Sequence, residues 1–133
     1  MDIPERFTSL EDFMAARKTI ASQYDPAVPT IVIPAGTCCQ ASGANALIRA
    51  AKGHLLQRKL TGKVRLRITG CHGFCAMEPS VLVEPRRTFY PRVTSDMMPA
   101  IIDAATRGEA IKDLMFIDPA TGDAVEIQDD ISF

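Results

Sequence analysis

The sequence predicts an α/β domain with a short four-stranded mixed sheet and helices on its faces. Two observations support this: several segments are β-branched or alternate between apolar and polar residues, and others repeat apolar residues at helical spacing. At 133 residues with 47% hydrophobic content, the chain has the size and composition of one ordinary domain with a real core. A formal net charge of −1 gives no reason to expect nucleic acid or an anionic membrane as the partner.

The N-terminal segment, residues 1–29, is expected to be an arm followed by a helix. Ser9 has the character of an N-cap, with Asp12 three residues later, and apolar residues then recur at roughly helical spacing. Asp25-Pro26 ends this helix near Tyr24, because a proline disfavours the helical conformation of the residue before it.

A buried strand and a long helix are predicted next. Thr30–Ile33 is short, β-branched and bounded by prolines, which is typical of a buried strand. After a Gly-containing loop with Cys38 and Cys39, apolar residues spaced three or four apart predict a helix that starts near Ala44 and closes at Gly62. Both cysteines are thus expected at or just before a helix N-terminus, where the macrodipole favours an anionic sulfur.

Three further strands are predicted. Residues 63–69 alternate strictly, so one face of this strand is expected to be buried. Residues 80–83 and 88–93 are joined by a four-residue turn and predict an antiparallel hairpin. The apolar residues of the strand at 63–69 are Val64, Leu66 and Ile68.

A last main helix follows the hairpin. Residues 94–96 are expected to cap it, Pro99 falls close to its first turn, and Gly108 ends it. The resulting order, β-α-β-loop-β-β-α, is a thioredoxin-like arrangement with a right-handed first crossover. We expect this domain to span residues 30–117, with residues 118–133 as an acidic tail or linker.

The four cysteines lie in two Gly-containing loops, with Cys38 and Cys39 in one and Cys71 and Cys75 in the other. The chain shows no secretion signal, so a cytoplasmic, reducing location is expected, where structural disulfides are disfavoured. No apolar run approaches the roughly 20 residues of a membrane span, so direct membrane insertion is not expected. Metal or redox chemistry is therefore favoured. A four-thiolate zinc site fits the adjacent pair poorly, and the C-x-x-C of a thiol–disulfide enzyme is absent.

The cysteine loop and its surroundings carry a family resemblance. Residues 70–75, Gly-Cys-His-Gly-Phe-Cys, followed by Glu84-Pro85, resemble the thioredoxin-like [2Fe-2S] ferredoxin family. More closely, the sequence resembles the N-terminal domain of the NADH-binding flavoprotein subunit in NADH:quinone oxidoreductase-like complexes and in NAD-linked hydrogenases and formate dehydrogenases. Residues 89–93 and 118–122 match as well, and the resemblance covers about Thr30–Phe133. The end of the chain within what resembles a linker favours a fragment or a remodelled relative.

The resemblance implies a [2Fe-2S] cluster bound by four thiolates, two from each loop. Its cofactor and metal ligands would be Cys38, Cys39, Cys71 and Cys75. Cys39 matches the usual second ligand, but Pro34 occupies the position of the first and cannot bind iron. Cys38 is the thiol left to replace it.

The resemblance also implies an electron-transfer domain or subunit of a multisubunit NAD(P)H-linked oxidoreductase, not catalytic on its own. Its partners would be a flavoprotein domain or subunit that binds FMN and NADH, together with other iron–sulfur subunits. The alternative is a cluster-free thioredoxin-like module that only docks the flavoprotein. His72 is either an iron ligand, as histidine is in Rieske centres, or an exposed ring on the loop.

Overall fold

A computed structural model describes residues 6–132 and contains one main sheet. Its strands are β1 (Thr30–Pro34), β2 (Arg65–Thr69), β3 (Val81–Glu84) and β4 (Thr88–Tyr90), in the order β2-β1-β3-β4. β1 and β2 are parallel, whereas β3 runs antiparallel to both β1 and β4. The predicted four-stranded mixed sheet and its hairpin are therefore confirmed.

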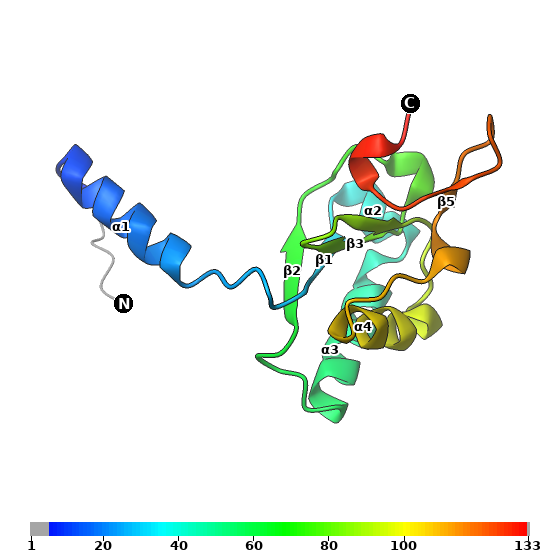
Figure 1. Cartoon of the computed structure of the whole chain (residues 1–133), viewed down its shortest axis with the longest axis horizontal. Coiled ribbons are helices and arrows are strands. Elements are labelled where there is room, and N and C mark those ends of the chain that lie inside the picture. The colour runs from blue at the N-terminus through cyan, green and yellow to red at the C-terminus, as the bar shows by residue number, and fades with distance from the viewer. Residues whose placement is uncertain (1–5, 133) are drawn as a thin grey trace.

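Four α-helices accompany the sheet in the described residues (Figure 1): α1 (Leu10–Ser22), α2 (Thr37–Ser42), α3 (Ala44–Gln57) and α4 (Met98–Thr106). A small second hairpin pairs β5 (Phe116–Ile117) with β6 (Ala124–Val125). The described residues also form four single 3₁₀ turns: η1 (Cys75–Met77), η2 (Ser95–Met97), η3 (Lys112–Leu114) and η4 (Gln128–Asp130).

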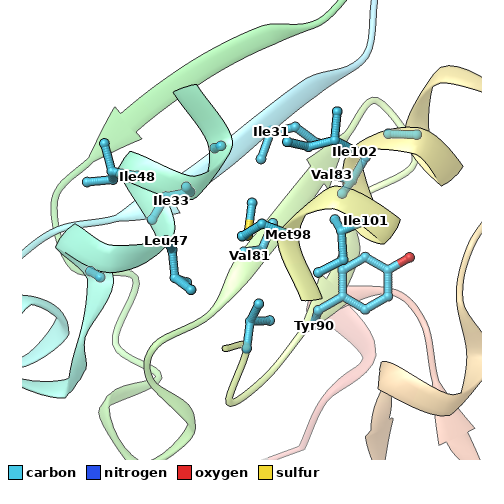
Figure 2. Packing of buried hydrophobic residues seen from close by; sticks show 14 of the residues in the cluster. Ile31, Ile33, Leu47, Ile48, Val81, Val83, Tyr90, Met98, Ile101 and Ile102 are labelled. Carbon is cyan, nitrogen blue, oxygen red and sulfur yellow. The ribbon is translucent and has the colours of Figure 1, made fainter. Parts of the chain in front are cut away.

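Both long helices of the domain, α3 and α4, pack on the same face of the sheet. Ile31 and Ile33 of β1 and Val81 and Val83 of β3 alternate toward this face, as the two-residue period of a strand requires. Figure 2 shows these side chains meeting the apolar stripes of the two helices. The helix residues in this cluster are Leu47, Ile48, Ala51 and Leu55 from α3, and Met98, Ile101, Ile102 and Ala105 from α4.

Among the described residues, the opposite face of the sheet is covered by irregular chain and short 3₁₀ turns and not by an α-helix. Val32, Leu82 and Phe89 point to this side and pack with Ile131. Part of the segment 118–133, expected as an acidic tail or linker, lies on the sheet here: Phe89 N–H donates to the carbonyl of Glu126 at 2.8 Å, and Gln128 N–H donates to the carbonyl of Arg87 at 3.1 Å. Its status as a unit separate from residues 30–117 stays a prediction. An open cavity of about 540 Å³ remains beside this segment.

The predicted N-terminal helix is present as α1, and its capping is confirmed. Ser9 Oγ accepts the N–H of Asp12 at 3.1 Å, and Asp12 Oδ2 accepts the N–H of Ser9 at 3.1 Å, which is a capping box. The helix projects away from the body of the molecule (Figure 1), and its large apolar side chains are exposed. Residues 1–5 of the expected arm lie outside the described residues.

The cysteine pair was expected in a loop, but it lies in a short helix of its own. Cys38 and Cys39 belong to the first turn of α2, and Gly43, with a φ of 115°, separates α2 from α3. A left-handed residue at this point breaks the helical path, and glycine adopts that conformation without a Cβ penalty. The prediction of a helix N-terminus beside the cysteines holds, but the helix concerned is α2.

Two predicted boundaries are wrong for identifiable reasons. The helix expected to reach Gly62 ends at Gln57, because Lys59 takes a φ of 54° and Leu60 N–H bonds back to the carbonyl of Leu55 at 2.9 Å in a Schellman motif. The last predicted strand, 88–93, ends at Tyr90, because Pro91 has no N–H to donate and Arg92 takes a φ of 49°.

The apolar face of β2 is less buried than its alternation predicts. Val64 is buried and Leu66 is half-buried, but Ile68 is 46% exposed. β2 is an edge strand of the sheet, so its outer end is packed from one side only.

Candidate metal centre

The two cysteine loops meet at the carboxyl ends of the parallel strands β1 and β2. Ala35 N–H donates to the carbonyl of Thr69 at 2.9 Å, which extends the β1–β2 ladder by one bond into the loops. A Cβ added to Gly36 would lie 3.1 Å from Cys71 Cβ and 3.3 Å from Cys71 N. The missing side chain of Gly36 therefore lets the two loops touch beside Cys71.

Three of the four thiols come together at this junction. Cys71 Sγ and Cys75 Sγ are 3.8 Å apart, and Gly73 N–H donates to Cys71 Sγ at 3.2 Å. The pKa of Cys75 is raised to about 11, first by its hydrogen bond with Cys71, then by the negative charge of Cys71 and of Cys38. Cys38, Cys71 and Cys75 are all exposed, so we call them the thiol patch.

Cys39 lies behind this patch, in the core. Because successive residues of a helix point about 100° apart, α2 turns Cys39 inward while Cys38 faces solvent. Burial is the main cause that raises the pKa of Cys39, followed by the negative charge of Glu78. The buried Glu78 carboxylate accepts the N–H of Ser80 at 2.9 Å and its hydroxyl at 3.1 Å.

Sequence reasoning did not identify Glu78 as a neighbour of Cys39. The available signal was its position directly before Pro79 and an apolar strand. An acidic residue next to a buried strand stands out, because a carboxylate is rarely buried without polar partners. The carboxylate is tolerated there because Ser80 supplies two hydrogen bonds.

His72 is half-buried, so the expectation of an exposed ring is wrong. Its Nε2 lies 2.9 Å from Thr69 Oγ1, and its Nδ1 is buried without a hydrogen-bond partner among the described residues. The ring lines the cavity on the second face of the sheet, together with Phe74 of the same loop. Its role as an iron ligand stays an untested alternative.

The donors of the thiol patch suit an iron–sulfur cluster, since soft thiolates are the ligands such clusters use. Residues 6–132 contain no group of three or more His, Cys, Asp or Glu side chains that is already placed to hold a metal ion. Cys38, Cys71 and Cys75 are open to solvent, whereas Cys39 is fully buried. Pro34 is buried at the end of β1 opposite Thr69 and has no thiol to offer.

Comparison with known proteins identifies the family. Residues 23–106 match the family described as "Thioredoxin-like [2Fe-2S] ferredoxin". The chain belongs to this family. A "Ferredoxin, 2Fe-2S" from Clostridium pasteurianum is 30% identical over 77 residues, which are 57% of this chain and 76% of that protein.

Solved structures of the family share the fold. The wild-type thioredoxin-like [2Fe-2S] ferredoxin from Aquifex aeolicus superposes with a TM-score of 0.59 at 20% identity, covering 65% of this chain and 93% of that one. A cysteine-to-serine variant of the same protein gives 0.59 at 19% identity, covering 65% and 95%. The thioredoxin-like α/β fold is thereby confirmed.

Family membership makes the chain a [2Fe-2S] ferredoxin-type electron-transfer protein, and a [2Fe-2S] cluster is its expected cofactor. The relatives named above are ferredoxins and not subunits of NADH oxidoreductases. Within the described residues, no helix has the length and apolarity needed to cross a membrane.

Proposed function

We propose that this chain is the [2Fe-2S] electron-transfer domain or subunit of a multisubunit NAD(P)H-linked oxidoreductase. The observation that carries the proposal is the exposed thiol patch, Cys38, Cys71 and Cys75, where two loops meet. The sequence has no Gly-rich phosphate loop of the kind that binds a dinucleotide. Electrons from NADH must therefore reach the chain through a partner, for which we propose a flavoprotein that binds FMN and NADH, with other iron–sulfur subunits further along.

The residues that would hold the cluster are Cys38, Cys71 and Cys75, with Cys39 as the fourth thiolate. When bound, a [2Fe-2S] cluster accepts and donates one electron at a time. Gly73 N–H already donates to the sulfur of Cys71, and such bonds stabilise negative charge on a thiolate. Cys39 is the least accessible member of the set, because it is buried and faces the Glu78 carboxylate.

Ligand substitutions test the cluster. Protein purified without oxygen, or reconstituted with iron and sulfide, should contain iron and acid-labile sulfide in equal amounts and bleach with dithionite. Cys38→Ser should lose this iron, and Cys39→Ser should lose it as well if Cys39 is the fourth ligand. His72→Ala tests the alternative that the histidine is an iron ligand, and under the four-thiolate proposal this variant should keep the colour. Iron-free wild-type protein after reconstitution would instead support the cluster-free docking module.

Isolation from the source cells tests the partners. We place the complex in the cytoplasm, so tagged chain should be recovered from the soluble fraction together with an FMN-containing polypeptide. NADH should bleach the cluster in this preparation and leave the isolated recombinant chain unchanged. A loaded cluster without any NADH-reducible partner would reject the multisubunit proposal and leave a free ferredoxin.

A further inference from the structure

Cys71 and Cys75 are placed to react with each other. Their sulfurs are 3.8 Å apart, both residues are exposed, and both thiols are free. A disulfide requires a sulfur–sulfur separation of about 2.0 Å, so the two atoms must approach by about 1.8 Å. Because both residues are exposed, a small oxidant in solution can reach this pair.

The loop that carries the pair has room for this approach. Residues 71–74 lie outside every helix and strand, and Cys75 begins the single 3₁₀ turn η1. A Cβ added to Gly70 or to Gly73 would meet nothing within 4 Å, so no neighbouring group packs against the loop at either glycine. A small movement of this loop is therefore not opposed by contacts at these two positions.

The other pairs of thiols are less well placed. Cys38 and Cys39 are neighbours in α2, but one is exposed and the other is buried, and side chains that point apart cannot be bridged without moving the backbone. A bond from Cys38 to Cys75 would join two separate loops. A bond from Cys71 to Cys75 closes a loop with only three residues between its ends, which costs less chain entropy.

We propose that Cys71 and Cys75 form a reversible disulfide when the chain holds no cluster, and that this bond closes the thiol patch to iron. The bond and the cluster exclude each other, because a disulfide sulfur no longer carries the negative charge of a thiolate ligand. In a reducing compartment such a bond is transient and reports oxidation. Its effect on iron rests on the ligand roles proposed above, whereas the bond itself can be observed without iron.

A small-molecule disulfide such as oxidised glutathione is the oxidant in this reaction. One cysteine sulfur attacks it, forms a mixed disulfide and releases one molecule of thiol. The other cysteine sulfur then attacks the cysteine sulfur of the mixed disulfide, which forms the Cys71–Cys75 bond and releases a second molecule of thiol. The two cysteines together lose two electrons and two protons, and the small disulfide gains both.

Intact-mass measurement of the cluster-free full chain tests the bond. After incubation with oxidised glutathione, the mass should fall by two hydrogen atoms with no glutathione attached, and alkylation should find two free thiols in place of four. Trypsin locates the bond, because Cys71 and Cys75 share the peptide 68–86 whereas Cys38 and Cys39 share the peptide 19–49. The peptide 68–86 should resist alkylation until dithiothreitol is added.

Two variants identify the partners in the bond. Cys75→Ser removes one partner, so this variant should keep glutathione attached at Cys71 as a mixed disulfide. Cys38→Ser is the matched control, because it removes the third exposed thiol and should still form the bond in the peptide 68–86. A wild-type chain that only accumulates glutathione, or a bond that links the peptide 19–49 to the peptide 68–86, would overturn the proposal.

Cluster transfer tests the effect of the bond on iron. A scaffold protein that carries a [2Fe-2S] cluster serves as the donor, so that no free sulfide or thiol reduces the bond. The reduced chain should take up iron, and the oxidised chain should take up none until it is treated with dithiothreitol. Transfer to an oxidised chain whose bond stays intact would overturn the closing of the patch. A reduced chain that accepts no iron would instead count against the proposed function, while the mass measurement would still decide whether the bond forms.

Discussion

Gly36 offers a direct test of how closely the two cysteine loops must approach. Its φ of −65° is one that any residue adopts, so replacing it by alanine adds no backbone strain, only a Cβ. That Cβ would lie 3.1 Å from Cys71 Cβ, whereas carbon atoms pack best at roughly 3.5 to 4.0 Å. Two of the three nearest atoms, at 3.3 and 3.5 Å, belong to the backbone of Cys71, which cannot rotate away.

The expected cost follows from two opposing effects. Overpacking of this kind destabilises by about 1 to 3 kcal/mol. Replacing glycine by alanine also restricts the unfolded chain, which stabilises by about 0.4 to 1 kcal/mol. Gly36→Ala should therefore lower the free energy of unfolding by about 1.3 kcal/mol at the midpoints of the two ranges, and by about 2.6 kcal/mol at most. The added Cβ should also push the two cysteine loops apart, which should reduce the amount of iron bound after reconstitution.

Urea unfolding of the iron-free protein measures the stability change, and iron analysis measures the second effect. Gly53→Ala is the matched control: it lies within α3, nothing stands within 4 Å of its Cβ position, and alanine favours the helix. That variant should be as stable as the wild type or more so, and should bind iron normally. Equal stability of Gly36→Ala and the wild type, with full iron content, would show that the loops are not in close contact.

Two further predictions concern charged contacts away from the cysteines. His54 on α3 lies 2.8 Å from Asp103 on α4, and this hydrogen bond holds the pKa of Asp103 below its usual value. A lowered carboxyl pKa contributes stability above the unfolded value of about 3.9, so the difference in unfolding free energy between wild type and Asp103→Asn should shrink as the pH falls below that value. Arg87 donates to both carboxylate oxygens of Asp129, at 2.7 and 2.9 Å, and to Gln128 Oε1 at 3.1 Å. Arg87→Ala should speed hydrogen exchange in residues 126–132 while leaving α3 unaffected; an unchanged exchange rate there would show that this pair does not hold the segment.

Much of the fold could be predicted from local sequence signals. The β-branched, proline-bounded run at Thr30–Ile33 and the capping residues Ser9 and Asp12 each specify their element through nearby residues alone. The end of α3 could not be predicted in this way. Lys59 adopts a left-handed conformation that the sequence does not favour, because the Schellman hydrogen bond and the packing of Leu60 stabilise it.

The candidate site was predicted in part. The spacing of Cys71 and Cys75 marked the loop, and the structure brings their sulfurs together. What could not be predicted is the division of the adjacent pair, with Cys38 in solvent and Cys39 in the core. That division depends on α2, a helix of six residues whose limits are set by Gly36 and Gly43 and not by an apolar repeat.

β1 separates the linker of the projecting helix α1 from the loops that carry the thiol patch. Thr30 follows the linker to α1, and Pro34 precedes the loops that carry the thiol patch. The five residues of this strand span roughly 17 Å. The projecting helix α1 is therefore joined to the body at the far end of β1 from the thiol patch, so a contact made through α1 would leave the thiol patch accessible.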